Sequence, residues 1–371
     1  MALNTYVEQI NHLGQSIWYD NLSLDVLRSG ELKRLLDLGV SGLTSNPTIF
    51  KKAIADTSHY DEKIAELAGR GDNAEQICET LMVDDVGTAA DLLLDTYNKT
   101  NGADGYASIE VSPRLAHNVD ETVKAAVSLW NRLQRPNIMI KIPATEAGIR
   151  AIEQVLSQGI NVNVTLIFSC SVYRNVANAF LSALNNLNEN QLKNISSVAS
   201  FFVSRVDSII ERELNRRGET LGTSAEQFIG AVGIANSKLA YETFEEIFRG
   251  APFSNYSERG VRAQRPLWAS TGTKNPAFSP VLYVEQLIGS DTVNTLPPQT
   301  LESLLAHAEI RETISKGLPE AKSLLQELEE HGIDLEALLE ELQQSGVEAF
   351  ITSYDELLSA VEQKRAKLIA A

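Results

Sequence analysis

Short apolar runs alternate with longer amphipathic segments along most of this 371-residue chain. That alternation is typical of βαβ units, in which helices join parallel strands. Eight runs have the length and composition of strands, at residues 16–20, 40–45, 107–111, 137–144, 161–168, 197–203, 265–271 and 291–296. Eight strands with helices between them favour an α/β fold of the closed (β/α)8 TIM-barrel type, with an open doubly wound sheet as the alternative.

Amphipathic helices are predicted between these strands at residues 24–36, 119–134 and 146–158. Gly39 and Gly159 close the first and the last of them. Glycine suits these positions because it tolerates the left-handed conformation in which many helices end.

Two longer segments predict helices outside the basic barrel. Residues 46–106 exceed one βα connection and predict two or three extra helices. Residues 298–371 are rich in Leu, Glu and Gln and predict a helical C-terminal part that covers the barrel. Ser353 and Glu356 have the spacing of a capping box, which predicts that the last helix begins there. No Pro/Gly/Ser-rich linker precedes this region, so we expect residues 1–371 to form one domain.

Polar residues recur at every second position in several strands, and alternate residues of a strand face opposite sides. One set is expected to face the helices: Ile138, Ile140, Ile142, Val162, Val164 and Leu166. The other set is expected inside the barrel: Trp18, Asp20, Thr44, Asn46, Ser108, Glu110, Met139, Lys141, Asn161, Asn163 and Thr165.

Lys141 is the most informative of these interior residues. Barrel interiors are usually apolar, active sites occupy the C-terminal rim, and buried charges are rare unless paired. A neutral lysine amine at that place can form a Schiff base with a carbonyl compound. Burial favours the neutral amine, whereas the carboxylates of Asp20 and Glu110 oppose it. A purely structural ion pair of Lys141 with Glu110 is the alternative interpretation.

Composition and motifs argue against several other classes of protein. The formal net charge of −17 disfavours a nucleic-acid-binding surface, and a phosphate site in this chain must concentrate its cations locally. No segment has the length of a membrane span and the N-terminus lacks a secretory pattern, so we expect a cytoplasmic protein without membrane contact. Cys78 and Cys170 lie far apart, outside any CxxC, and are expected to be reduced. No metal-ligand cluster or GxGxxG motif is present, so neither a metal nor a dinucleotide cofactor is expected.

Several strand-end motifs occur together and in order. They are Leu43-Thr44-Ser45-Asn46-Pro47, Ile109-Glu110-Val111, Ile138-Met139-Ile140-Lys141-Ile142-Pro143-Ala144-Thr145, Asn161-Val162-Asn163-Val164-Thr165-Leu166-Ile167-Phe168-Ser169 and Ser200-Phe201-Phe202-Val203-Ser204-Arg205. With them, the chain from about Asp20 to the eighth strand resembles the transaldolases. The lysine strand and the strand after it carry the most specific part of the likeness. The segments around residues 51–100 and 305–371 resemble a longer subgroup of that family.

The resemblance implies a transferase of the non-oxidative pentose phosphate pathway that uses no cofactor. It implies transfer of a dihydroxyacetone unit from sedoheptulose 7-phosphate to glyceraldehyde 3-phosphate, which gives erythrose 4-phosphate and fructose 6-phosphate. These sugar phosphates are the implied partners, and no oligomeric state follows from the likeness. The implied catalytic residues are the Schiff-base lysine Lys141, the general acid/base Asp20, and Glu110 and Thr165, which hold a proton-shuttling water.

The resemblance also implies a set of substrate-binding residues. Asn46 and Asn163 bind donor hydroxyls beside Thr44, while Ser200 and Arg205 bind the phosphate. The family usually has a second phosphate cation, often Arg, after the seventh strand. Lys274 is the nearest candidate here, and it offers a point charge in place of a bidentate fork.

Two other functions are weighed against this one. Fructose-6-phosphate aldolases of the same superfamily release dihydroxyacetone, but they are shorter and carry an uncharged residue where Glu110 stands. A catalytically silent barrel that serves as a binding or assembly protein is the other alternative. The intact set of Asp20, Glu110, Lys141 and Thr165 argues against it.

Overall fold

Eight parallel strands close into a barrel in the order β1 to β8. The computed structural model describes residues 5–55, 57–217 and 226–370. The strands are β1 Gln15–Tyr19, β2 Gly42–Leu43, β3 Ala107–Glu110, β4 Ile138–Pro143, β5 Val162–Ile167, β6 Ser197–Phe202, β7 Arg265–Ala269 and β8 Thr292–Leu296. β1 pairs with β8 along its whole length, from Gln15 opposite Thr292 to Tyr19 opposite Leu296. The predicted (β/α)8 barrel is therefore confirmed, and the open sheet was the wrong alternative.

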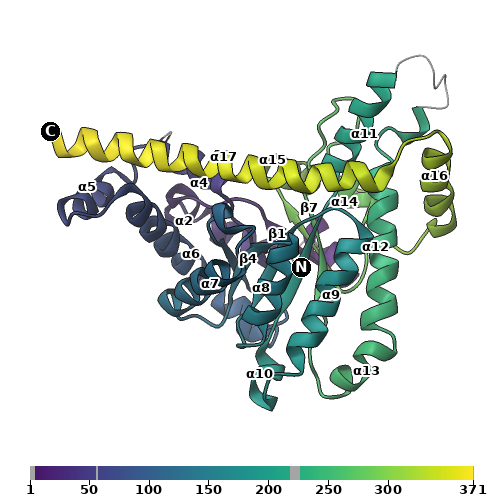
Figure 1. Ribbon diagram of the computed structural model, residues 1–371, viewed down its shortest axis with the longest axis horizontal. Coiled ribbons are helices and arrows are strands. Elements are labelled where there is room, and N and C mark those ends of the chain that lie inside the picture. Colours follow the sequence, from purple (N-terminus) through teal and green to yellow (C-terminus); the bar gives the residue numbers. More distant parts are fainter. Residues whose placement is uncertain (1–4, 56, 218–225, 371) are drawn as a thin grey trace.

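Helices surround the barrel and extend over one of its ends (Figure 1). Those of the first half are α1 Tyr6–His12, α2 Leu24–Arg28, α3 Glu31–Asp37, α4 Pro47–Ala55, α5 Asp61–Gly69, α6 Ala74–Lys99, the 3-10 helix η1 Pro113–Leu115, α7 Val119–Leu133, α8 Glu146–Leu156 and α9 Cys170–Leu184. Those that follow are α10 Glu189–Asn194, α11 Ser204–Arg217, α12 Val232–Phe248, α13 Ala251–Glu258, α14 Leu282–Gln286, α15 Pro298–Ala306, α16 Leu318–Glu330 and α17 Leu335–Ala370. The extra helices expected in residues 46–106 are α4, α5 and α6.

The strand alternation divides the core into two layers, as the sequence predicts. Ile138, Ile140 and Ile142 belong to the apolar cluster between strands and helices. Met139 belongs to a second cluster with Trp18, which runs from the barrel interior out to α11, α16 and α17. The phase of β4 therefore points Lys141, which is two residues from Met139, toward the barrel axis.

Leu166 departs from the predicted alternation. It lies in the cluster that joins the barrel interior to α11 and α17, and not in the cluster of Ile138, Ile140 and Ile142 between the strands and the surrounding helices. Its φ is +58°, and the pairing of β5 with β6 shifts register between Val164 and Ile167. Such an irregularity re-aims the side chain, so the prediction that Leu166 shares the helix-facing layer of Val162 and Val164 was wrong, and the side chain packs against α17 instead.

The predicted helix 24–36 is two helices, α2 and α3. The break lies at Gly30, whose φ of +83° is left-handed and is not helical. Glycine adopts this conformation with little cost, so the chain can turn there between two short amphipathic segments.

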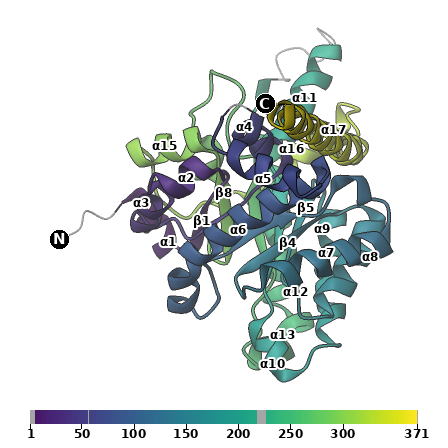
Figure 2. The same ribbon diagram turned by 90° about the vertical axis from the view of Figure 1, so that its left-hand side faces the viewer.

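Helix α17 spans 36 residues, so it is about 54 Å long. It packs against α4, α5 and α6, runs along one side of the molecule in Figure 1, and is seen nearly end-on in Figure 2. Ser353 and Glu356 lie inside this helix and not at its start, so the predicted capping box was wrong. Thr48 donates a hydrogen bond to Ser353 (3.0 Å), and Lys51 pairs with Glu356 (2.8 Å), so both residues dock α17 on α4.

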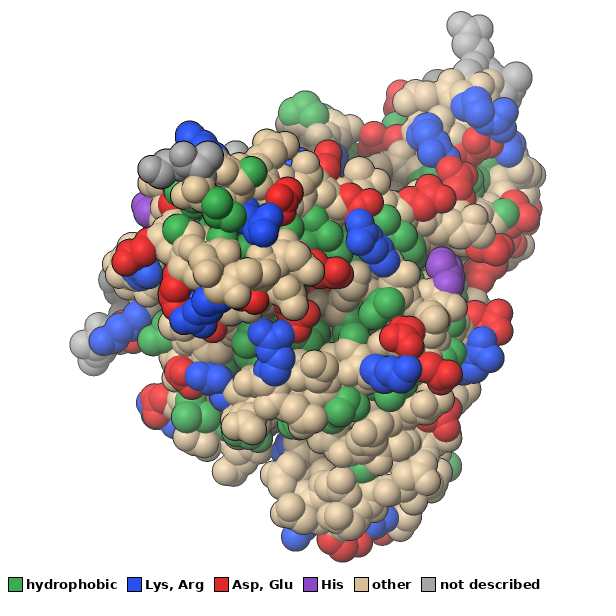
Figure 3. All heavy atoms as spheres, turned by 60° about the vertical axis from the view of Figure 1, so that its left-hand side comes forward, with side chains coloured by type: hydrophobic (Ala, Val, Ile, Leu, Met, Phe, Trp, Pro, Cys, Tyr) green, Lys and Arg blue, Asp and Glu red, His purple; other side chains and the backbone are tan. Residues whose placement is uncertain are grey.

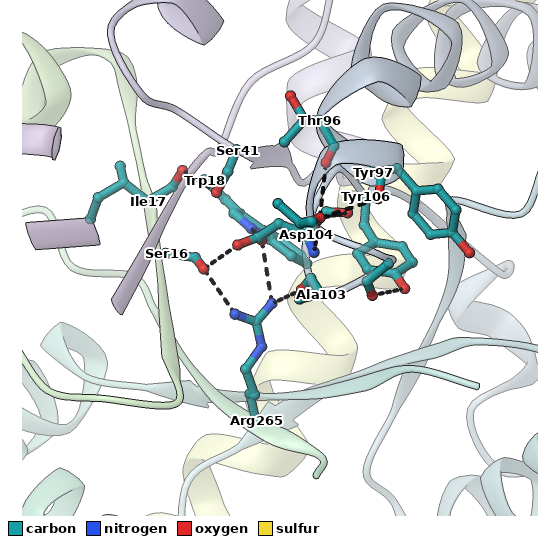
Figure 4. A network of polar contacts seen from close by, with 12 residues as sticks. Ser16, Ile17, Trp18, Ser41, Thr96, Tyr97, Ala103, Asp104, Tyr106 and Arg265 are labelled. Carbon is teal, nitrogen blue, oxygen red and sulfur yellow. Dashed lines mark hydrogen bonds and ion pairs between the residues drawn. The ribbon is translucent and has the colours of Figure 1, made fainter. Parts of the chain in front are cut away.

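A polar network closes the N-terminal end of the barrel (Figure 4). Asp104 accepts hydrogen bonds from Ser16 and from the indole Nε1 of Trp18, the latter at 2.7 Å. Arg265, the first residue of β7, pairs with Asp104 (3.3 Å) and donates to Ser16 (2.8 Å). The Trp18 ring lies so close to Gly42 that a Cβ there would meet it at 2.6 Å, so only glycine fits.

The surface carries both signs of charge. On the face in Figure 3, acidic and basic side chains are interspersed and apolar side chains form small groups. Among the described residues, no helix is both long and apolar enough to cross a bilayer. Both cysteines are free thiols; Cys78 is buried, and Cys170 begins α9.

Candidate active site

A cavity of about 640 Å³ opens at the C-terminal ends of the strands, where TIM barrels carry their active sites. Eight of the ten predicted site residues line it: Asp20, Thr44, Asn46, Lys141, Thr165, Ser200, Arg205 and Lys274. The two others, Glu110 and Asn163, are buried residues that contact this wall from within the barrel. The structure thus brings together residues from most of the strands.

Lys141 projects from β4 into the barrel. Its Nζ lies 3.4 Å from Oε2 of Glu110 and donates to the carbonyl oxygen of Ser45 at 3.3 Å. The Lys141 and Glu110 side chains are only 7% and 1% exposed. The pair has formed because the register sets Glu110 of β3 directly beside Lys141 of β4.

Asp20 follows the last residue of β1, and the backbone fixes it by donating from Asp20 N to Leu296 O at 2.8 Å. Thr44 donates a hydrogen bond to Asp20 Oδ1 (2.7 Å) and shares another with Thr295 of β8 (2.7 Å). The acid is therefore held on the cavity wall from two sides. Asn46 has a structural task as well, because its side-chain oxygen accepts from the backbone N–H of Ile49 (3.0 Å) near the start of α4.

Asn163 and Ser200 form a hydrogen-bonded chain beneath the cavity. Ser200 donates to Asn163 Oδ1 (2.7 Å), and Asn163 donates to Ser108 (3.1 Å). Within the described chain, the hydroxyl of Thr165 and both carboxylate oxygens of Glu110 are buried without a hydrogen-bond partner, and Oε2 of Glu110 has only its 3.4 Å ion pair with Lys141. Buried polar groups are normally satisfied, so these orphans are places where a ligand or water can bind.

Burial raises the pKa of both acids near Lys141. For Asp20, the charge of Lys141, the Thr44 hydrogen bond and the charge of Arg205 act in the opposite direction. For Glu110, the charge of Lys141 is the main opposing influence. A carboxyl with a raised pKa holds a proton up to a higher pH, so these acids can accept a proton that leaves the lysine amine.

Three further cations line the same cavity: Lys52, Arg205 and Lys274. None of them forms a close ion pair within the part of the chain that the structure describes. Burial lowers the pKa of the Arg205 guanidinium, and the charges of Asp20 and Glu110 oppose that change. In an acidic protein, unpaired cations around one cavity make it a local attractor for anions. The described residues contain no cluster of three or more His, Cys, Asp or Glu side chains that could hold a metal ion.

Comparison with known proteins decides the family. The family model described as transaldolase/fructose-6-phosphate aldolase matches residues 17–361. The chain belongs to this transaldolase/fructose-6-phosphate aldolase family. A transaldolase of Mycolicibacterium paratuberculosis is 44% identical over 98% of both chains. Those of Mycobacterium tuberculosis and Mycobacterium ulcerans are 43% and 45% identical, over 100% and 94% of this chain and 99% and 94% of their own.

Several cavity residues of this transaldolase/fructose-6-phosphate aldolase family member were not predicted from the sequence, among them Lys52, Thr295, Phe202 and Phe350. Thr295 lies near the C-terminal end of β8 in the interior phase, so strand alternation could have found it. Phe202 stands between Ser200 and Arg205, where it looked like ordinary core. Phe350 comes from α17, and no local pattern places that helix over the barrel mouth.

Proposed function

We propose that this protein is a transaldolase that moves a dihydroxyacetone unit between sugar phosphates through a Schiff base on Lys141. The reaction would convert sedoheptulose 7-phosphate and glyceraldehyde 3-phosphate into erythrose 4-phosphate and fructose 6-phosphate. The observation that carries this proposal is the buried amine of Lys141, 3.4 Å from Glu110, in a cavity that also holds Asp20 and Arg205. The proposal agrees with the name of the curated relatives.

Imine formation requires protons to move between the amine, the carbonyl oxygen and a water molecule. Glu110 and Thr165 are suited to this role because their buried oxygens have no other hydrogen-bond partner in the described chain. We assign them to hold the water that carries protons during imine formation and hydrolysis.

Cleavage of the C–C bond requires a base for the hydroxyl of the departing aldehyde. We assign Asp20 to this role because it lines the cavity, and its raised pKa allows it to keep the proton and return it in the reverse direction. The protonated imine accepts the electron pair of the broken bond, so the three-carbon fragment remains on Lys141 as a stabilised carbanion.

Recognition of the phosphate falls to Arg205 with Ser200 and Lys274. All three line the cavity, and the two cations form no close ion pair among the described residues. The guanidinium fork can bind phosphate with two parallel hydrogen bonds, whereas the lysine adds a point charge. Thr44, Asn46 and Asn163 are assigned to the donor hydroxyls and to the orientation of the amine.

Two measurements test this function. Borohydride added with fructose 6-phosphate should fix a three-carbon adduct on Lys141, and mass spectrometry of the digested protein locates it. An unmodified Lys141 peptide would count against the mechanism. Incubation with fructose 6-phosphate and erythrose 4-phosphate should form sedoheptulose 7-phosphate, whereas an aldolase of the same family would release dihydroxyacetone.

Lys141→Ala provides the matching loss-of-function test. Turnover should disappear because no other described amine occupies the interior of the barrel, while the thermal unfolding transition should remain cooperative. Retained transfer activity in this variant would refute the assignment of the nucleophile.

A further inference from the structure

The ring of Phe350 lies beside both Lys141 and Arg205 in the cavity. Its ring centroid lies 5.5 Å from Nζ of Lys141 and 5.8 Å from Cζ of Arg205. The side chain is 7% exposed and lines the cavity wall. It therefore contacts both the amine assigned to hold the carbonyl carbon and the cation assigned to hold the phosphate. A ketose phosphate fixed at both ends would pass along this ring.

Helix α17 contacts the ends of β4 and β5 through the same face that carries Phe350. Gln343 donates from Nε2 to the carbonyl oxygens of Ala144 (2.9 Å) and Leu166 (3.3 Å), just after β4 and within β5. A Cβ at Gly346 would meet Cδ2 of Leu166 at 3.1 Å, so the helix approaches the barrel closely there. Residues 343, 346 and 350 are spaced by about one helical turn and share one face, so these contacts fix the height of the ring.

More distant contacts hold the rest of α17 in place. Arg114 beside β3 pairs with Asp355 at 2.7 Å, and Lys364 pairs with Asp61 of α5 at 2.6 Å. Arg365 donates to the carbonyl oxygen of Asp72 at 2.9 Å. With the contacts to α4, these pairs hold the helix along much of its length. The ring of Phe350 is thus a fixed part of the cavity wall.

We propose that Phe350 is a specificity-determining residue that makes this enzyme a transferase by keeping water from the carbanion. The inference rests on the proposed function. In transfer, the electron pair of the carbanion forms a new C–C bond to the aldehyde carbon, and Asp20 returns a proton to the aldehyde oxygen. If water gives its proton to the carbanion instead, the hydroxide left behind adds to the carbon of the protonated imine. The C–N bond of this adduct then breaks as the hydroxyl proton passes to nitrogen, so dihydroxyacetone leaves and the free amine of Lys141 is restored.

Two properties of the ring favour transfer. An apolar ring beside the reacting carbon excludes the water that would protonate it. The π face of the same ring, next to Nζ, attracts the positive charge that the protonated imine carries on that nitrogen. The exclusion of water acts while the three-carbon unit waits for its acceptor, whereas the attraction to the charged nitrogen acts on the protonated imine before C–C cleavage and again after the new C–C bond has formed. Transfer and release of dihydroxyacetone both consume the donor, so the total consumption of donor alone does not report the effect of the ring.

The test compares two products formed in one tube. Fructose 6-phosphate and erythrose 4-phosphate are supplied together, and both dihydroxyacetone and sedoheptulose 7-phosphate are quantified. Phe350→Ala should raise the ratio of dihydroxyacetone to sedoheptulose 7-phosphate by about tenfold, and Phe350→Leu should fall in between. The ratio does not depend on the fraction of folded enzyme, so a destabilised variant still gives an answer.

Ile351→Ala is the matched control. Ile351 is the next residue of α17, and it packs in the same apolar cluster but does not line the cavity. Its variant should keep the wild-type ratio. An unchanged ratio in Phe350→Ala, or an equal rise in Ile351→Ala, would overturn the inference about Phe350. Absence of sedoheptulose 7-phosphate with the wild-type protein would instead refute the proposed transaldolase function itself.

Discussion

Arg205 offers the sharpest test of how the cavity recognises its substrate. It lies in the first turn of α11, with its guanidinium carbon 5.0 Å from the ring centroid of Phe202 and 5.8 Å from that of Phe350. The guanidinium lies near both rings, and no described carboxylate forms a close ion pair with it. Its hydrogen-bonding groups are therefore free for an anionic ligand. Arg205→Ala removes this cation without breaking a close ion pair, and it also removes a longer-range charge that acts on Asp20 and Glu110.

The size of the effect follows from the contacts that are lost. A hydrogen bond to a charged group contributes about 1.5–3 kcal/mol, and the guanidinium fork can make two of them. Lys274 and Ser200 remain and take over part of the binding, so we expect a net loss of about 3 kcal/mol. That is a fall of about 150-fold in kcat/KM for fructose 6-phosphate. Arg205→Lys keeps the charge but loses the fork, so its fall should be about tenfold.

The assay uses two donors that differ only in the phosphate. Fructose 6-phosphate or fructose is supplied with erythrose as the acceptor, so sedoheptulose is the product of both reactions. Arg205→Ala should lower the rate with fructose by no more than about threefold, because that donor has no phosphate to lose. An equal fall in kcat/KM with both donors would show that Arg205 shapes the cavity and does not bind the phosphate.

Three other changes probe the acids and the stability of the barrel. Glu110→Gln should lower transfer about a hundredfold and raise dihydroxyacetone release relative to it, because the proton shuttle is impaired while C–C cleavage is retained. Asp85→Asn should raise the free energy of unfolding at pH 8, because burial raises the pKa of Asp85 from 3.8 to about 7. That difference of about 3 in pKa corresponds to about 4 kcal/mol at most, and the gain should fade as pH falls from 7 to 4. Asp104→Ala should lower the free energy of unfolding by about 2 kcal/mol, because the Trp18 indole N–H and the Arg265 guanidinium lose their carboxylate partner.

Each of these predictions has its own control. A ratio of release to transfer that stays unchanged in Glu110→Gln would remove the water-shuttle role. For Asp85, the buried carboxyl is neutral in the wild type at pH 4, so a gain of equal size at pH 4 and pH 8 in urea unfolding would contradict the stated cause. The exposed pair of Glu31 and Arg34 is the comparison for Asp104, and Glu31→Ala should cost less than about 1 kcal/mol. Equal losses for these two variants would mean that the network at the barrel floor contributes little.

Much of the site could be predicted because strand alternation is a local property. The interior phase of β4 fixed the direction of Lys141, and parallel pairing set Glu110 beside it. Strand ends of a barrel converge on one rim, so residues at those ends lie around one cavity even when they are distant in sequence. Glu110 and Asn163 have the right phase but lie deeper than the cavity wall. Alternation gives the side of the sheet and not the depth along the barrel.

The predictions that were wrong share a different cause. Leu166 left the helix-facing layer because a backbone irregularity in β5 turned it, and only the packing around it stabilises a left-handed leucine. Ser353 and Glu356 matched a helix-start pattern, but α17 continues through them because their side chains bond to α4. A short motif competes with every contact that the finished fold offers, and here the tertiary contacts prevailed.

The sequence by itself determined the barrel and the interior direction of Lys141, because alternation and chain order act over a few residues at a time. Only the tertiary structure decided that Phe350 stands over that lysine. The apolar face of a helix requires burial, but its composition does not specify the surface that buries it. That choice depended on Gln343, Gly346 and their partners at the ends of β4 and β5, which meet α17 only after the barrel has closed.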